Sequence, residues 1–245
     1  MHPILFKFGI FQVYSYGLMV ALAFWVSVSL LARRGYILGL GRDFFWNVSF
    51  WALTGGILGG RLMYILLNLD FFLKDPLEIF KLWHGGLVWY GGFAAGLVSA
   101  ILYLKRYKAP ILKTLDLAAP FIALAYSIGR IGCFLNGCCY GRPVSWGIYF
   151  PEHNDRLIPV QLISSFDLLV IFIILRFLEE RPHRPGSVVA YCLLFSSLER
   201  FLMEFLRDDS ARNFFGLTIF QLISIVIFIS ALILWFIILR FPRKT

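Results

Sequence analysis

Residues 129–141 read Gly-Arg-Ile-Gly-Cys-Phe-Leu-Asn-Gly-Cys-Cys-Tyr-Gly, and they close a long apolar segment of the chain. A guanidinium is unfavourable inside a bilayer unless it lines a cavity or pairs with another group, so Arg130 needs a partner. Three glycines, Gly132, Gly137 and Gly141, permit tight turns and a close approach of the backbone to a ligand. The stretch therefore predicts a loop-edged pocket at membrane depth.

The composition of the whole chain is that of a helical membrane protein. Of its 245 residues 60% are hydrophobic, and they form long uninterrupted apolar runs. Many Trp and Tyr residues fall near the ends of these runs, where interfacial anchors are common. We therefore expect an all-α, polytopic integral membrane protein whose residues 1–245 form a single transmembrane domain.

Seven segments are apolar enough and long enough to cross a bilayer, at about residues 12–32, 46–69, 86–105, 112–135, 159–180, 187–207 and 216–240. The N-terminal Met1-His2-Pro3 has neither a basic region nor a small-residue cleavage site, so we expect no removable signal peptide. Residues 70–84 are too short and too charged to span, and they suit a segment that lies in the outer interface. Residues 137–158 form the longest polar loop, also on the outer side.

The distribution of basic residues along the chain indicates the membrane topology. The net charge of +9 is spread over short loops rather than gathered on one face, so we expect no nucleic-acid partner. Most Lys and Arg residues follow the first, third, fifth and seventh predicted spans. By the positive-inside rule the N-terminus lies outside and the C-terminus is cytoplasmic.

Three arginines, Arg61, Arg130 and Arg200, lie within predicted spans. Each is past the middle of a span that runs outward from the cytoplasm, so all three are expected in the outer half of the membrane. Three cations at one depth would be prohibitively costly if they faced lipid tails, which predicts a shared polar cavity. The natural ligand of such a cavity is an anion at the level of the lipid headgroups.

The 129–141 stretch resembles the signature of the bacterial prolipoprotein diacylglyceryl transferases, Gly-Arg-(Ile)-Gly-Asn-Phe-x-Asn-Gly-Glu-x-x-Gly. The matching positions are Gly129, Arg130, Gly132, Phe134, Asn136, Gly137 and Gly141. Cys133 and Cys138 stand where the pattern has asparagine and glutamate. The resemblance continues at 16–19 (Tyr-Gly-Leu-Met), at 59–61 (Gly-Gly-Arg), at 200–207 (Arg-Phe-Leu-Met-Glu-Phe-Leu-Arg) and at the start of the last span.

Two further positions depart from the family pattern. Tyr90, which precedes Gly91 and Gly92, stands where the family has a histidine to which a catalytic role is assigned. With a pKa near 10, an ordinary tyrosine is a poor base at neutral pH. Ile158 likewise replaces the histidine of the family's His-Pro-x-Gln pattern, whose glutamine is Gln161 here.

The resemblance implies transfer of the diacylglyceryl group of phosphatidylglycerol to the lipobox cysteine in the signal peptide of a prolipoprotein. The products are a thioether and glycerol phosphate, no cofactor or metal takes part, and the setting is the bacterial cytoplasmic (inner) membrane with its lipids. The residues carried over as catalytic are Arg130, Arg200, Glu204, Tyr90 and Tyr16. Those carried over as substrate-binding are Arg61, Gly91, Gly92, Gly129, Cys133, Asn136, Gly137, Cys138, Gly141, Gln161 and Arg207.

The chemistry of the side chains fits this reaction. Cleavage of a C–O bond places negative charge on the departing phosphate, and fixed guanidinium donors stabilise such charge. Arg130 and Arg200 are the candidates for this role. The general base is open between Tyr90, Glu204 and a cysteine.

Several alternatives remain open in the sequence. Arg200 and Glu204 are four residues apart on one helical face, so they could form a purely structural ion pair. Asp116 reads as a solvated or capping carboxylate.

Cys-x4-Cys-Cys matches no standard zinc spacing and reads as buried thiols, or as a disulfide between Cys133 and one of its neighbours. The departures at Cys133, Tyr90 and Ile158 also allow a transferase with another acceptor or a non-catalytic lipid-binding or lipid-moving protein. A monomer would suffice to enclose a phospholipid.

Overall fold

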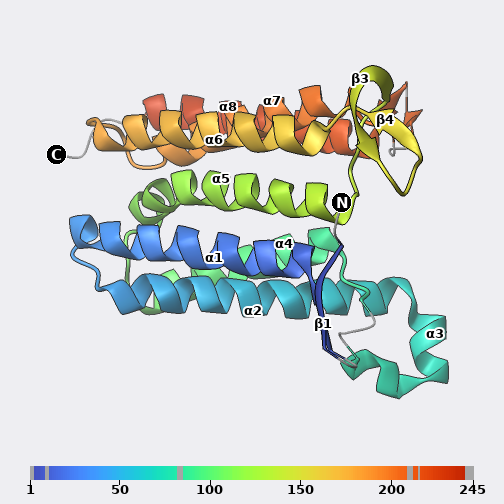
Figure 1. The fold of residues 1–245 in the computed structure, drawn as a ribbon. Helices are drawn as coiled ribbons and strands as arrows, with labels where there is room; N and C mark the ends of the chain where they lie inside the picture. The colour runs from blue at the N-terminus through green and yellow to red at the C-terminus, as the bar shows by residue number, and fades with distance from the viewer. Residues whose placement is uncertain (1–2, 9–10, 82–84, 209–211, 215, 241–245) are drawn as a thin grey trace. The chain divides into compact units, whose positions relative to one another are not determined.

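A computed structural model of the chain describes residues 3–8, 11–81, 85–208, 212–214 and 216–240 (Figure 1). Helices dominate these residues: α1 (Ser15–Arg34), α2 (Arg42–Leu67), α3 (Leu69–Lys74), α4 (Trp89–Arg106), α5 (Ile111–Asn136), α6 (Val160–Glu180), α7 (Ser187–Met203) and α8 (Ile219–Arg240). Two short 3-10 helices are η1 (Gly35–Leu38) and η2 (Pro76–Phe80). The predicted all-α class is confirmed.

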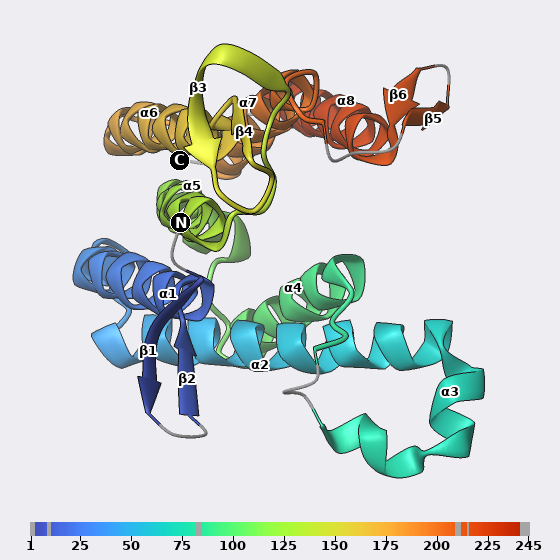
Figure 2. The same cartoon turned by 45° about the vertical axis from the view of Figure 1, so that its right-hand side comes forward.

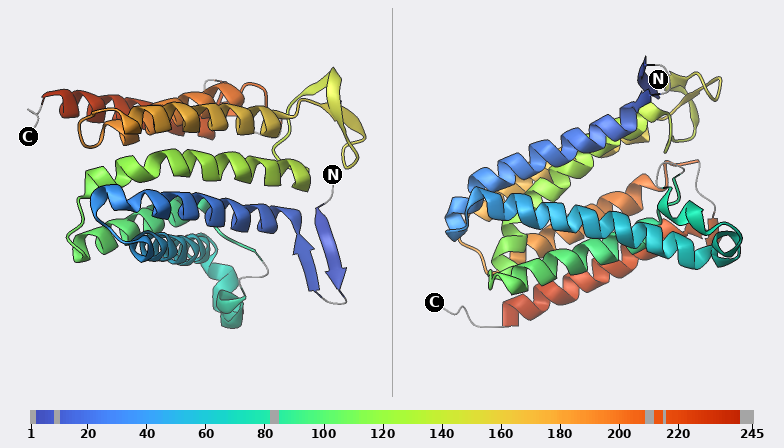
Figure 3. Two further views of the ribbon diagram at one scale, coloured as in Figure 1. Left: turned by 60° about the vertical axis from the view of Figure 1, so that its left-hand side comes forward. Right: turned by 90° about the horizontal axis from the view of Figure 1, so that it is seen from below.

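Three small antiparallel hairpins, which the sequence did not predict, accompany the helices. They pair β1 (Ile4–Phe8) with β2 (Phe11–Tyr14), β3 (Pro143–Phe150) with β4 (Asp155–Leu157), and β5 (Arg212–Phe214) with β6 (Leu217–Thr218). The β3–β4 hairpin lies within the predicted outer loop 137–158, and Figure 3 shows it beyond the ends of α5 and α6. Of the predicted interfacial segment 70–84, the structure describes α3 and η2, and residues 82–84 lie outside the described residues.

Five helical segments are long and apolar enough to cross a membrane. They are Ser15–Leu38, Arg42–Leu67, Ile111–Asn136, Val160–Glu180 and Ile219–Arg240. The chain is therefore a multi-pass membrane protein by the length and composition of its helices. The two other predicted spans correspond to α4 and α7, which are helices of 18 and 17 residues.

The last helix illustrates why these segments suit lipid. Large apolar side chains of α8, among them Val226, Ile233 and Phe236, are more than half exposed. A helix that is apolar on nearly every face is stable only where hydrocarbon surrounds it. Its exposed surface is therefore the expected surface of a membrane span.

The chain divides into two compact units, of which the second is Ala32–Thr114. Its helices α2 and α4 pack through glycines. A Cβ added at Gly55 would lie 2.1 Å from Ser99 Oγ, and one at Gly59 would lie 2.1 Å from Ala95 Cβ. On α4, a Cβ at Gly91 would lie 2.4 Å from Met63 Cβ. The small residues thus allow the two helix backbones to approach closely.

The first unit comprises Met1–Leu31 and Leu115–Thr245. Its core joins three helices, α5, α6 and α7, through Ala119, Ala123, Leu168, Ile171, Leu175, Val188 and Cys192. Helix α7 packs against both α6 and α8 (Figure 2). Helix α1 approaches α5 at Gly132, where an added Cβ would lie 2.9 Å from Met19 Cβ.

Asp116 caps the start of α7 from a neighbouring helix. Its two carboxylate oxygens accept hydrogen bonds from the backbone N–H groups of Gly186, at 2.6 Å, and Val189, at 2.9 Å. His183 Nε2 lies 3.5 Å from the same carboxylate. These contacts satisfy N–H groups that a helix N-terminus leaves unpaired, so Asp116 is a buried capping residue rather than a solvated one.

Candidate functional site

The site begins where α5 ends. Gly137 has a φ of +77°, a left-handed conformation that glycine adopts easily. The N–H of Gly137 donates to the Phe134 carbonyl at 3.1 Å, and the N–H of Cys138 donates to the Cys133 carbonyl at 3.2 Å. This pair of bonds is a Schellman motif, which folds the chain back over the last helical turn. As a result, Cys138 returns to the side of Cys133.

Two of the predicted substrate contacts hold this turn in place. The side chain of Gln161 donates from Nε2 to the Cys138 carbonyl at 2.6 Å. The backbone at Gly141 lies close to two neighbouring segments, because an added Cβ would come within 2.7 Å of the Ile158 side chain and of the Leu206 carbonyl. The contacts of Gln161 and Gly141 therefore support the turn from α6 and from the segment after α7.

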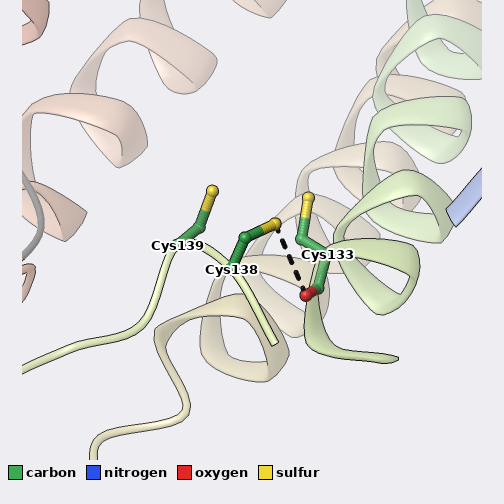
Figure 4. Close-up of side chains that lie close together, drawn as sticks. All are labelled: Cys133, Cys138 and Cys139. Atoms are coloured by element: carbon green, nitrogen blue, oxygen red, sulfur yellow. Dashed lines mark hydrogen bonds between the residues drawn. The ribbon is translucent and has the colours of Figure 1, made fainter. Parts of the chain in front are cut away.

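The turn gathers three free thiols, Cys133, Cys138 and Cys139, whose Sγ atoms all lie within 4.8 Å of one another (Figure 4). Cys139 has a φ of +65°, which is uncommon for a residue with a side chain. Hydrogen bonding to the Cys133 and Cys138 thiols, together with the charges of Arg207 and Arg130, lowers the pKa of Cys139 below its ordinary value.

Arg130 is buried beside this cluster on α5, with 7% of its surface exposed. Its Nη2 donates to the Tyr126 hydroxyl at 2.5 Å, and its guanidinium lies 4.8 Å from the centre of the Tyr126 ring. Its buried Nε–H has no hydrogen-bond acceptor among the residues that the structure describes. One donor of this arginine is therefore left for a ligand.

Arg200 forms the second cationic part of the site. Its Nη2 lies 2.9 Å from Glu204 Oε2, and Arg207 Nη1 lies 3.8 Å from the same oxygen. Glu204 is fully buried, and Arg200 and Arg207 both lie over the Phe220 ring. Within the described ranges, the buried Nη1 of Arg200 has no acceptor. The ion pair expected from the spacing is present, and it leaves one guanidinium nitrogen of Arg200 unused.

These groups act on one another electrostatically. Tyr126, Arg130 and Glu204 all contribute to the electrostatic environment of Arg200. Tyr16 on α1 interacts in the same way with Arg130 and with the three cysteines. The site thus joins α1, α5, α7 and the turn after α5, all within the first unit.

Two members of this site were missed by the sequence analysis. Tyr126 precedes Arg130 by one helical turn, and that spacing could have identified it. Glu199 is buried, interacts electrostatically with Arg130, and accepts a hydrogen bond from Ser164 Oγ at 2.5 Å. Its position directly before Arg200 places it on a different helical face, so helical spacing does not link it to the arginine.

Arg61 belongs to the second unit, where its guanidinium binds backbone carbonyls. Nε donates to Ile79 at 3.1 Å, and Nη1 donates to Gly85 at 2.6 Å and to Gly86 at 3.4 Å. Nη2 donates to the carbonyls of Glu78 and Lys81. These contacts engage the donor groups on all three nitrogens, so they favour a structural role for Arg61 over the phosphate-facing, substrate-binding role that the resemblance implies.

The remaining predicted residues divide between the units. Tyr90, Gly91 and Gly92 lie at the start of α4 in the second unit, where both glycines approach α2. A pocket in that unit is lined by Trp51, Ser99, Leu102, Tyr103, Arg106 and Tyr107, and it includes no predicted site residue. In the first unit, Gly129 has open space where a Cβ would be, and Asn136 ends α5. Their roles in substrate binding stay predictions.

Comparison with known proteins connects this site to one family. A family model described as prolipoprotein diacylglyceryl transferase matches residues 3–237. A phosphatidylglycerol–prolipoprotein diacylglyceryl transferase of Clostridium tetani is 37% identical over 233 residues, which cover 92% of this chain and 93% of the relative. One from Aeromonas hydrophila is 36% identical over 244 residues, which cover 95% of this chain and 89% of the relative. The chain belongs to the prolipoprotein diacylglyceryl transferase family.

Proposed function

We propose that this protein transfers the diacylglyceryl group of phosphatidylglycerol to the thiol of a lipobox cysteine in a prolipoprotein. The reaction forms a thioether and releases glycerol phosphate. Family membership over nearly the whole chain supports this, and so do the names of the relatives in Clostridium tetani and Aeromonas hydrophila.

The observation that carries the proposal is the pair of buried arginines with unused donors. The Nε of Arg130 and the Nη1 of Arg200 are buried and lack acceptors among the described residues. A buried donor without a partner is costly, so such groups are retained where a ligand supplies the acceptor. A phosphate has several strong acceptor oxygens and a negative charge, and it would satisfy both arginines.

In the reaction, the two arginines stabilise the charge that grows on the phosphate as the glycerol C–O bond breaks. Glu204 holds Arg200 and Arg207 in place through the contacts at 2.9 Å and 3.8 Å. Tyr126 orients Arg130 through its hydroxyl. The arginines act as electrostatic groups, and Glu204 and Tyr126 position them.

The proposed setting is the bacterial cytoplasmic membrane, with the N-terminus outside and the C-terminus in the cytoplasm. We propose that α4 and α7 cross it beside the five longer segments. At about 1.5 Å per residue, 18 and 17 residues give lengths of about 27 Å and 25 Å, close to the hydrocarbon thickness of about 30 Å. The site then lies on the outer side, where secreted precursors arrive.

The proposal is tested with purified protein, vesicles of phosphatidylglycerol with labelled acyl chains, and a lipobox peptide. The expected product is a thioether-linked diacylglyceryl peptide. A peptide with serine in place of the lipobox cysteine should remain unlabelled, because its hydroxyl is a weaker nucleophile. Binding of phosphatidylglycerol without any product would instead favour the non-catalytic lipid-binding alternative.

A further inference from the structure

We propose that Cys133, Cys138 and Cys139 bind a thiophilic divalent cation of the zinc type, with the acceptor thiol of the lipoprotein precursor as its fourth ligand. This inference rests on the proposed transfer to a thiol. It gives the cation the task of deprotonating that thiol, for which Tyr90 is a poor candidate. It departs from the sequence analysis, in which the Cys-x4-Cys-Cys spacing gave no reason to expect a metal.

The distances between the three sulfur atoms suit coordination of one ion. All three Sγ atoms lie within 4.8 Å of one another, and none of the cysteines is in a disulfide. Zinc–sulfur bonds of about 2.3 Å in a tetrahedral site place the sulfurs about 3.8 Å apart. The widest pair therefore needs to close by no more than about 1 Å, a change within reach of side-chain rotation. A disulfide would require a sulfur–sulfur separation of about 2.05 Å.

The backbone around the thiols holds all three on one side of the turn (Figure 4). The Schellman hydrogen bond from the Cys138 N–H to the Cys133 carbonyl holds Cys138 next to Cys133. The amide of Gln161 fixes the Cys138 carbonyl at 2.6 Å, and Cys139 adopts a positive φ. Supporting contacts of this kind around ligands are typical of metal sites.

The site has an open position and a suitable charge. The group consists of three cysteines and includes no fourth His, Cys, Asp or Glu from the described part of the chain. Three thiolates and a divalent cation carry a net charge of −1, and a fourth thiolate makes it −2. Arg207 and Arg130 both act on Cys139 electrostatically, so they offset this charge. Catalytic zinc sites likewise keep one position open beside three protein ligands.

The chemical step balances without any redox partner. Each thiol that binds the cation releases its proton to solvent, and the acceptor thiol does so when it takes the fourth position. Its thiolate then attacks the glycerol carbon of phosphatidylglycerol that bears the phosphate oxygen. The S–C bond forms as the C–O bond breaks, and glycerol phosphate leaves with the electron pair. The cation thus favours the deprotonated form of the acceptor thiol, and the arginines stabilise the departing glycerol phosphate.

Metal binding is tested first. Reduced, purified protein is equilibrated with Zn²⁺ and its metal content is measured, with about one ion per chain expected. Replacing the ion with Co²⁺ should give the near-ultraviolet charge-transfer band of thiolate–cobalt bonds. Cys133→Ser, Cys138→Ser and Cys139→Ser should each weaken binding by at least about tenfold, because each removes a ligand. Cys192→Ala is the matched control, since Cys192 lies in the core of α5, α6 and α7 and should leave binding unchanged.

The fourth position is tested with the lipobox peptide. The cobalt spectrum should change when the cysteine peptide is added and should not change with its serine counterpart. The proposal is overturned if reduced wild-type protein binds no metal or if the three cysteine variants bind metal as tightly as the wild type. It is also overturned if the cobalt spectrum does not change when the cysteine peptide is added. Circular dichroism of each variant separates loss of a ligand from loss of the fold.

A transfer assay on the same samples separates this inference from the proposed function. Full transfer by protein stripped of metal would overturn the role of the cation and leave the transferase function intact. No transfer by the zinc-loaded protein would contradict the transferase function, while the cobalt spectrum would still decide whether the metal site exists.

Discussion

Arg130 and Arg200 show how much of this protein's chemistry depends on single residues. Each arginine is largely buried, and each keeps a nitrogen without an acceptor among the described residues. The sequence identified both, because an arginine in an apolar helix is conspicuous. It could not show that Arg61 is occupied by five backbone carbonyls, since these come from a segment 17 to 25 residues later in the chain.

Glu204 is the buried carboxylate between Arg200 and Arg207. Glu204→Gln keeps the size of the side chain but removes the negative charge between Arg200 and Arg207. Because breaking a buried ion pair leaves its partners uncompensated, the free energy of unfolding should fall by about 3 kcal/mol. Chemical denaturation in detergent measures this. Glu152→Gln, on an exposed loop, is the control and should change stability by less than about 0.5 kcal/mol. Equal effects of the two variants would contradict the role given to Glu204.

The long helices follow from the apolar runs, while their ends depend on contacts between residues distant in the sequence. The predicted span 187–207 extends beyond α7, which ends at Met203. Arg207 instead forms a bridge with Gly141, and the N–H of Arg142 donates to the Leu206 carbonyl at 3.0 Å. Such pairing between remote segments leaves no periodic pattern in the sequence, and this is also why the three hairpins were not predicted.

The cap of α7 gives a prediction about pH. Hydrogen bonding to Asp116 raises the pKa of His183 above its ordinary value, and the carbonyl of Arg181 adds to this effect. Because the folded pKa exceeds the unfolded one, the stabilisation is complete below about pH 6.5 and is lost as the pH rises through the folded pKa. The thermal midpoint should therefore fall between pH 6 and pH 9, by a larger amount in the wild type than in His183→Gln. Identical pH profiles would contradict the pairing.

The whole molecule is a multi-pass membrane protein, and two of its loops report whether α4 crosses the membrane. With seven crossings and an outer N-terminus, the β3–β4 hairpin is outside and residues 181–186 are cytoplasmic. With only the five longer spans, both positions change sides. A site-specific protease sequence inserted at Asn154 should be cleaved in spheroplasts by added protease, whereas the same sequence at His183 should be protected. With the N-terminus outside, the opposite pattern would show that α4 does not cross, because both positions precede α7 in the chain.

The most direct test of the whole account is the rate of diacylglyceryl transfer by Arg200→Ala beside the wild type. Losing one preoriented donor to a developing charge typically lowers turnover by about 100-fold to 1,000-fold, and we expect a decrease in that range. Arg156→Ala removes an exposed arginine of the outer hairpin and should keep turnover near the wild-type value. A tenfold change in turnover corresponds to about 1.4 kcal/mol of transition-state stabilisation. If Arg200→Ala retains turnover within about threefold of the wild type, the Arg200 guanidinium does not stabilise the leaving phosphate.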